Sequence, residues 1–180
     1  GGDGTLSPVA PGDEPHDVFV SDPRDPVHTK GGGLCCWPGA IPGGAYDQTS
    51  VEERADVLVF TSEPLQAPLE ITGPVRVELW ASSSAVDTDF TAKLVDVRPD
   101  GYAMNLLDGI IRARYRNSAS SPEPMEPGRP YRFEIDLWAT SNVFLPGHRI
   151  RLEISSSNFP RFDRNLNTGA PFGEGAAGVV

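Results

Sequence analysis

The chain has 180 residues, 38% of them apolar, a length that suits one domain with a sizeable core rather than two. Its 19 Gly and 18 Pro are too many for long helices and favour short strands joined by turns. Fifteen basic against 25 acidic residues give a net charge of −10 with no basic cluster, which argues against a nucleic-acid or membrane partner. No apolar run approaches the roughly 20 residues that cross a bilayer.

Residues 1–50 are rich in Pro and Gly and predict an irregular connector with one short strand, at Val18–Val20. The first residues do not form a signal peptide, and we expect the chain to be part of a longer protein. Cys35 and Cys36 are adjacent, and a bond between neighbouring cysteines needs strained geometry. Two free thiols, buried as small hydrophobic groups under the connector, are therefore expected, which favours a reducing, cytoplasmic location.

From residue 51 to 180 the pattern predicts one β-sandwich domain. Residues 57–61 form a short apolar run, expected as a strand buried on both faces. Further on, apolar and polar residues alternate, which places one face of each strand in a core. The alternating segments are 75–80, 90–94, 131–138 and 149–154, while 110–116 fits either a strand or a helical turn. Strands at this spacing predict two antiparallel sheets packed face to face.

Trp80 and Trp138 fall on strand faces that otherwise carry charged residues. A large aromatic side chain on such a face often marks a contact surface, here with another domain. The alternative is that a loop, for example the connector, covers each ring.

Nucleophilic chemistry has no visible basis in the sequence. The Gly-x-Ser-x-Gly turn that exposes a catalytic serine is absent. His148 follows a Pro-Gly turn, where a solvated histidine is expected. Asp87 and Asp89 are expected to cap a turn or to pair with Arg161 or Arg164, rather than to act as acid and base. We therefore expect no catalytic residue and no cofactor.

One segment weakly resembles a calcium loop. Asp163, Asn165 and Asn167 place oxygen atoms at alternate positions, and Glu174 falls at the twelfth. The glycine comes one residue late and no helices are expected on either side. A loop stabilised by Asn and Asp side chains is the favoured interpretation, with calcium as the alternative, so no metal is predicted.

Three segments carry a family resemblance: Asp-Thr-Asp-Phe-Thr-Ala-Lys-Leu-Val-Asp-Val at 87–97, Thr-Ser-Asn-Val-Phe-Leu-Pro-Gly at 140–147, and residues 155–169. They are similar to the C-terminal domain of bacterial acyl hydrolases of the CocE/NonD and X-Pro dipeptidyl-peptidase type. The resemblance implies a jelly-roll β-sandwich of the galactose-binding-like type. It also implies that the serine nucleophile belongs to a preceding α/β-hydrolase domain and that this chain is inactive alone.

In that family the active site opens where the domains meet. The resemblance therefore implies that this chain stabilises the catalytic domain and that Leu34 and Trp37 line its acyl pocket; alternatively, these two residues only pack the connector onto the sandwich. A second function class is an independent carbohydrate- or ligand-binding module. Family members usually continue with a closing strand, so unpaired strand edges are expected to allow a homo-oligomer.

Overall fold

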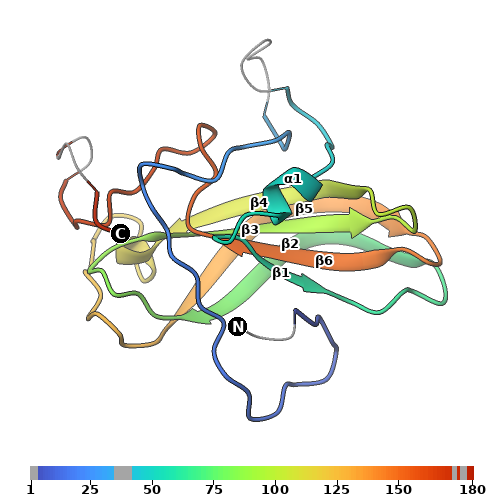
Figure 1. Cartoon of the computed structure of the whole chain (residues 1–180), viewed down its shortest axis with the longest axis horizontal. Helices are drawn as coiled ribbons and strands as arrows, with labels where there is room; N and C mark the ends of the chain where they lie inside the picture. The colour runs from blue at the N-terminus through green and yellow to red at the C-terminus, as the bar shows by residue number, and fades with distance from the viewer. Residues whose placement is uncertain (1–3, 35–41, 172–173, 175–177) are drawn as a thin grey trace.

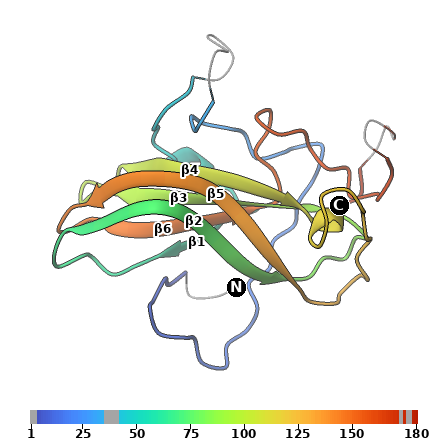
Figure 2. The same ribbon diagram turned by 180° about the vertical axis from the view of Figure 1, so that it is seen from behind.

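The computed structural model describes residues 4–34, 42–171, 174 and 178–180. Two antiparallel sheets pack face to face (Figures 1 and 2). In spatial order, the larger sheet contains β1 (Leu58–Thr61), β6 (Arg149–Ser155), β3 (Asp89–Val97) and β4 (Ala103–Arg112), and the smaller one contains β2 (Leu69–Ala81) and β5 (Tyr131–Phe144). The predicted all-β sandwich is confirmed.

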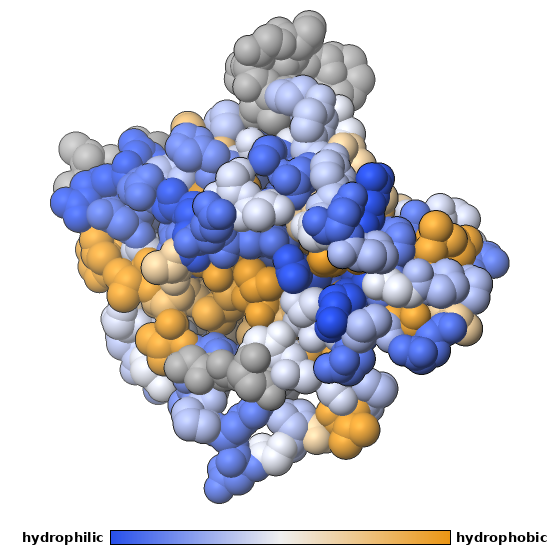
Figure 3. All heavy atoms as spheres, turned by 45° about the vertical axis from the view of Figure 1, so that its right-hand side comes forward, coloured by the Kyte–Doolittle hydropathy of each residue, from blue (hydrophilic) through white to orange (hydrophobic). Residues whose placement is uncertain are grey.

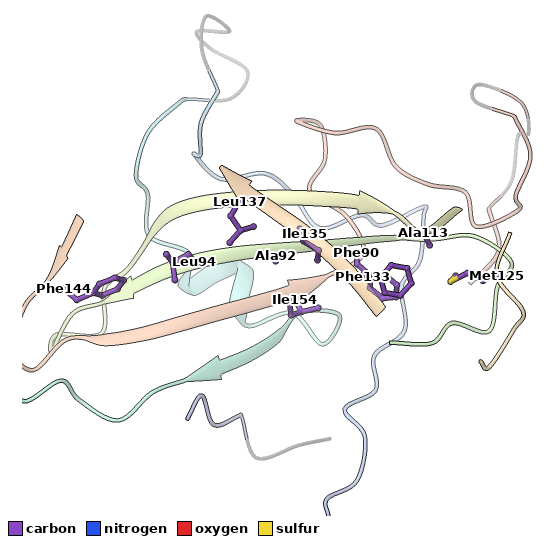
Figure 4. Packing of buried hydrophobic residues seen from close by; sticks show 10 residues of the cluster. All are labelled: Phe90, Ala92, Leu94, Ala113, Met125, Phe133, Ile135, Leu137, Phe144 and Ile154. Carbon is purple, nitrogen blue, oxygen red and sulfur yellow. The ribbon is translucent and has the colours of Figure 1, made fainter. Parts of the chain in front are cut away.

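The core lies between the sheets, as the alternation predicts. Phe133, Ile135 and Leu137 of β5 are almost completely buried, whereas the residues between them on the same strand are exposed. They meet side chains from β3, and the rings of Phe90 and Phe133 lie 4.8 Å apart in a tilted arrangement (Figure 4). Burying each of these side chains contributes roughly 1.5–3 kcal/mol, so this cluster is the main apolar source of stability.

Burial decreases towards one side of the sandwich. The core-facing residues Val75, Val77 and Leu79 of β2 are only half-buried, in contrast to their neighbours on β5. All four residues of β1 are half-buried as well, so the prediction of a strand buried on both faces is wrong. The reason is position: β1 is an edge strand of the larger sheet, and β5 rather than β2 packs closely against β3 and β4.

The connector differs from its prediction. Val18 and Val20 are exposed and belong to no strand, because no other segment pairs with them among the described residues. The later part of the connector packs on the outer face of the larger sheet, where Val27 is buried against Val51 and Val57. Val27 N–H also donates to Ser157 Oγ at 2.8 Å. This half of the connector therefore forms a third layer.

Two short helical segments complete the fold. Helix α1 (Thr49–Glu52), which ends the connector, was not predicted from the sequence. The ambiguous segment 110–116 forms the end of β4, up to Arg112, followed by one 3-10 turn, η1 (Ala113–Tyr115). In the described part of the chain, no helix has the length and apolarity needed to span a membrane.

Candidate functional site

A buried polar layer joins the connector to the larger sheet. Lys93 of β3 and Glu153 of β6 are almost wholly buried, with Nζ and Oε2 3.0 Å apart. Lys93 also donates to Gln48 Oε1 at 3.1 Å, and Gln48 Nε2 in turn donates to the carbonyls of Lys30 at 2.8 Å and Tyr46 at 3.0 Å. A buried charge needs further hydrogen-bond partners, and here Gln48 of the connector supplies one for Lys93.

A second buried carboxylate extends this layer. Asp108 of β4 lies opposite Lys93 in the sheet register and accepts hydrogen bonds from Arg161 and from Asn158 Nδ2. The Arg161 guanidinium lies directly against Gly32. A Cβ atom at position 32 would come within 2.9 Å of Arg161 Nη1, and the φ angle of Gly32 is +97°. The backbone conformation therefore favours glycine here, and an added Cβ would also displace the Arg161 guanidinium.

Two glycines pair where the chain leaves the sandwich and where it returns. Gly32 N–H donates to Gly44 O at 2.7 Å, and Gly44 N–H donates to Gly32 O at 2.9 Å. The chain thus leaves the sandwich and returns to it at one point, on the side of the larger sheet that carries α1 (Figure 1). We call residues 33–43 the 33–43 loop. Leu34 is half-buried at its start; Trp37, with Cys35 and Cys36, lies outside the described residues.

The return path of the loop is also held by the sheet. Tyr46 N–H donates to Asn105 Oδ1 at 2.6 Å, and Ala103 N–H donates to Asp47 Oδ1 at 3.0 Å. Asp47 receives two further hydrogen bonds from Thr49, which, together with the Ala103 N–H, lower the pKa of its carboxyl although desolvation opposes the change. The return side of the loop is therefore fixed to β4, and Gly32 at its start is held by Gly44.

Helix α1 contributes a carboxyl group to the polar layer. Arg151 Nη1 donates to Glu52 Oε2 at 2.6 Å, while Glu52 Oε1 and Glu153 Oε1 are buried without a hydrogen-bond donor. Burial raises the pKa of Glu52 to about 7; Arg151 opposes this change, and the neighbouring Glu153 reinforces it. A proton on Glu52 would supply a donor for Glu153, which is why this neighbour raises the Glu52 pKa.

A second ionic cluster lies at the start of β3. Arg112 donates to both carboxylate oxygens of Asp89, at 2.8 and 2.9 Å, and the side chain of Asp87 accepts from Arg114 N–H at 2.9 Å. Burial raises the pKa of Asp89 although Arg112 lowers it, and Asp89 in turn raises the pKa of Arg112. The bidentate geometry makes this a strong, charge-assisted pair.

The prediction that Asp87 and Asp89 pair with Arg161 or Arg164 is wrong. Arg161 binds Asp108, and Arg164 donates to the carbonyl of Pro23 at 2.9 Å. The physical reason is the antiparallel register, which places Arg112 at the end of β4 directly opposite Asp89 at the start of β3.

Three side chains of the weak calcium candidate, those of Asp163, Asn165 and Asn167, are engaged in hydrogen bonds or an ion pair. Asn165 donates its amide to Asp87 and Asp89 at 2.9 and 2.8 Å, and its oxygen accepts from the N–H of Asn167 at 2.9 Å. Asp163 Oδ2 lies 3.2 Å from Arg112, and Glu174 lines a cavity beside the same arginine. Within the described ranges, no three His, Cys, Asp or Glu side chains form a group that could hold a metal ion.

His148 corrects a prediction. Its side chain is only 14% exposed and its Nδ1 lies 2.8 Å from Asp96 Oδ1, so it is not a solvated turn residue. The pairing arises because the turn before β6 brings His148 against β3. In the described part of the chain, no serine or cysteine side chain hydrogen-bonds to the ring, and the arrangement is a structural pair rather than a triad.

Both candidate interface tryptophans lie open to solvent on the outer face of the smaller sheet. Trp80 is 67% and Trp138 72% exposed, so the alternative that a loop covers each ring is wrong. Trp138 has a φ angle of +70°, at a bulge where the register shifts between Pro74 and Arg76, and its N–H donates to Asp136 Oδ1 at 2.8 Å. A bulky residue in this left-handed conformation is strained.

Comparison with known proteins identifies the family. The sequence profile of the X-Pro dipeptidyl-peptidase C-terminal non-catalytic domain matches residues 2–175. The chain belongs to this family. The resemblance in the sequence is thereby confirmed.

Relatives of this non-catalytic domain are larger hydrolases. The chain is 54% identical to the cocaine esterase of Rhodococcus sp. (strain MB1 Bresler) over 168 residues, which are 93% of the chain and 29% of that esterase. It superposes with a TM-score of 0.84 on the aminopeptidase from the marine sediment archaeon Thaumarchaeota archaeon, with 35% identity, covering 94% of the chain and 30% of the aminopeptidase. An α-amino acid ester hydrolase matches with a TM-score of 0.77 and 37% identity, over 85% of the chain and 27% of the hydrolase. The chain thus spans less than a third of each.

Proposed function

We propose that this domain stabilises a serine α/β-hydrolase domain of the same polypeptide, an acyl esterase or X-Pro dipeptidyl-peptidase-like enzyme, and shapes its substrate pocket through the 33–43 loop. The observation that carries the proposal is the fixed base of this loop, where Gly32 and Gly44 pair above Arg161 and Asp108. A non-catalytic domain has no evident need to hold one loop so firmly unless that loop meets a partner in a defined position.

In acyl transfer, such a loop can help to orient the substrate. A substrate must be held within about 3.5 Å of the nucleophile in the correct orientation, and an apolar wall achieves this for an acyl group. Leu34 and Trp37 are the apolar residues that we assign to that wall. The jelly-roll topology implied by the resemblance is part of the same proposal.

Trp80 and Trp138 are proposed as contacts with the catalytic domain, because exposed aromatic residues are typical of interfaces. Their exposure also fits the second candidate, a carbohydrate-binding module with an aromatic platform. The register favours the first: Trp80 lies opposite Arg132, whereas Trp138 lies beside the bulge at Pro74, so the two rings occupy different parts of the sheet. Binding of sugars by the isolated chain, followed by tryptophan fluorescence, would support the second candidate.

A chimera tests the pocket role. This chain replaces the matching 168-residue region of the Rhodococcus cocaine esterase, and hydrolysis of p-nitrophenyl esters of increasing acyl length is measured. Trp37→Ala is expected to raise KM and to change the order of preference among the esters, whereas Trp80→Ala is expected to leave that order unchanged. An unchanged order in Trp37→Ala would reject the pocket role.

Assays of the isolated chain test whether the catalytic nucleophile lies in the other domain. We expect neither ester turnover nor labelling by a serine-reactive phosphonate, since the nucleophile is assigned to the catalytic domain. Turnover together with stoichiometric labelling would place a nucleophile in this chain and reject the proposal.

A further inference from the structure

Apolar and polar side chains are mixed over the face of the molecule shown in Figure 3, and the base of the 33–43 loop is distinguished by its buried contacts rather than by its surface. The side chain of Arg161 is only 11% exposed, and that of its partner Asp108 is 5% exposed. Arginine is rarely buried unless it is paired, and this pair lies where the chain leaves the sandwich at Gly32. Arg161 therefore joins the buried polar layer to the start of the loop.

The backbone of Arg161 is held by a short parallel ladder between the connector and the segment that follows β6. Phe159 N–H donates to Val27 O at 2.8 Å, and Thr29 N–H donates to Phe159 O at 2.7 Å. At the end of this ladder, Arg161 N–H donates to Thr29 Oγ1 at 3.2 Å. The main chain at Arg161 is thus fixed beside the connector without any contribution from its side chain.

The side chain of Arg161 is fixed separately, by β4. Its guanidinium donates to Asp108 Oδ1, and Asn158 Nδ2 donates to the other carboxylate oxygen at 2.9 Å. Asp108 belongs to a strand that pairs with β3 along its length, so this carboxylate is part of the rigid sheet. The guanidinium therefore has a defined position before any contact with the loop is considered.

The guanidinium packs against the first two residues of the path into the loop. An added Cβ at Gly32 would lie 2.9 Å from Arg161 Nη1, and one at Gly33 would lie 3.5 Å from Nη2 and 4.0 Å from Cζ. The planar group thus lies along two consecutive residues. Because Gly32 pairs with Gly44 through two backbone hydrogen bonds, the position that Arg161 gives to the start of the loop also determines where the chain returns.

We propose that Arg161 is a positioning residue for substrate selection, which sets where and in which direction the 33–43 loop leaves the sandwich and thereby the acyl preference of the hydrolase. This inference rests on the proposed pocket role of that loop. Arginine suits the task because its guanidinium is planar, rigid and permanently charged. One nitrogen, Nη1, binds Asp108, while Nη2 lies against Gly33. A lysine ammonium has no second nitrogen for this contact.

Hydrogen exchange in the isolated chain tests the positioning. The double variant Arg161→Met/Asp108→Asn removes the ion pair without leaving a buried unpaired charge. The N–H of Gly44, which donates to Gly32 O at 2.9 Å, should exchange about tenfold faster in this variant, because the start of the loop is no longer held. The amides of β6 should keep their exchange rates, which shows that the fold is intact. Unchanged exchange at Gly44 would overturn the proposal.

Kinetics in the esterase chimera test the consequence for substrate selection. The double variant should raise KM for the longer p-nitrophenyl esters about tenfold, with kcat changed less than about twofold, and should alter the order of preference. Arg161→Met alone leaves Asp108 unpaired and should be less stable than the double variant, yet both should show the same altered order. A purely structural role predicts that the native order returns together with stability in the double variant, and that result would overturn the proposal.

Two further variants distinguish failure of this inference from failure of the proposed function. Arg164→Met removes an arginine that binds the connector at Pro23 O rather than at the loop, and it should keep the native order of preference. If Trp37→Ala changes the order and Arg161→Met/Asp108→Asn does not, the role of Arg161 is rejected and the pocket role stands. If neither variant changes the order, the pocket role is rejected and this inference with it.

Discussion

Lys93 and Glu153 lie side by side on neighbouring strands, and their 3.0 Å ion pair is almost completely excluded from water by the connector. Removing one partner of a buried pair leaves an uncompensated charge, which typically costs about 3–5 kcal/mol.

Lys93→Met is therefore expected to lower the unfolding free energy of the domain by about 3 kcal/mol, and Lys93→Met/Glu153→Gln by less than the sum of the two single changes. Urea unfolding at pH 7 measures this cycle. Arg132→Met is the control, because its partner Glu78 lies at the surface and the loss should stay below about 1 kcal/mol. If Lys93→Met and the control Arg132→Met lowered the unfolding free energy equally, a role for the buried pair would be contradicted.

Glu52 predicts a pH dependence of stability. Its pKa in the folded domain is about 7, above the ordinary 4.5, so its contribution is fully present below about pH 4.5 and is lost as the pH rises through 7. Allowing for solvent screening and Arg151, we expect a loss of about 1–2 kcal/mol.

Glu52→Gln should remove this slope while keeping a donor for Glu153. Unfolding free energies measured between pH 5 and 8 check it, with the exposed Glu53→Gln as the control that keeps the slope. The surrounding charged groups, Arg151, Glu153, Lys93 and Asp108, are unchanged in both variants.

The loop base can be tested with two glycines of similar backbone conformation. Gly32 has a φ angle of +97° and lies against Arg161, whereas Gly101 has +90° and no atom within 4 Å of an added Cβ. Gly101→Ala should cost about 1 kcal/mol of stability through strain alone. Gly32→Ala should cost about 1–2 kcal/mol more and should also raise KM in the esterase chimera. A stability loss without a change in KM would separate the loop base from the substrate pocket.

Trp138 offers a test of strain held for function. Trp138→Gly should raise the unfolding free energy of the isolated domain by about 1 kcal/mol, because glycine adopts the positive φ angle without strain. Trp80→Gly, at a similarly exposed position without positive φ, should lower it. In the chimera both variants should reduce thermal stability if the rings contact the catalytic domain.

The alternating pattern correctly located the core-facing residues of β2, β3, β5 and β6, because each of these strands has one face against the other sheet. It failed for β1, whose apolar residues are half-exposed on an edge, and for Val18–Val20, which no strand pairs. Short apolar segments carry no information about their neighbours, so burial on both faces could not be distinguished from an edge position.

The buried polar layer was not predicted. Alternation assigns Lys93 and Glu153 to a solvent-facing side, and only the connector, folded back over that side, buries them. Their third partner, Gln48, is 45 residues from Lys93 in sequence. The family resemblance identified the non-catalytic role correctly, but the arrangement of these side chains depends on contacts between distant segments that periodicity does not encode.

The pairing of Gly32 with Gly44 uses backbone atoms alone, and its anchors, Arg161 and Asp108, lie outside the loop that it closes. The segment between the two glycines can therefore be exchanged during evolution, in sequence and in length, without altering the side chains that hold its ends. Under the proposed pocket role, substrate range can then diverge by exchange of this short segment, at a site where mutation carries little risk for folding.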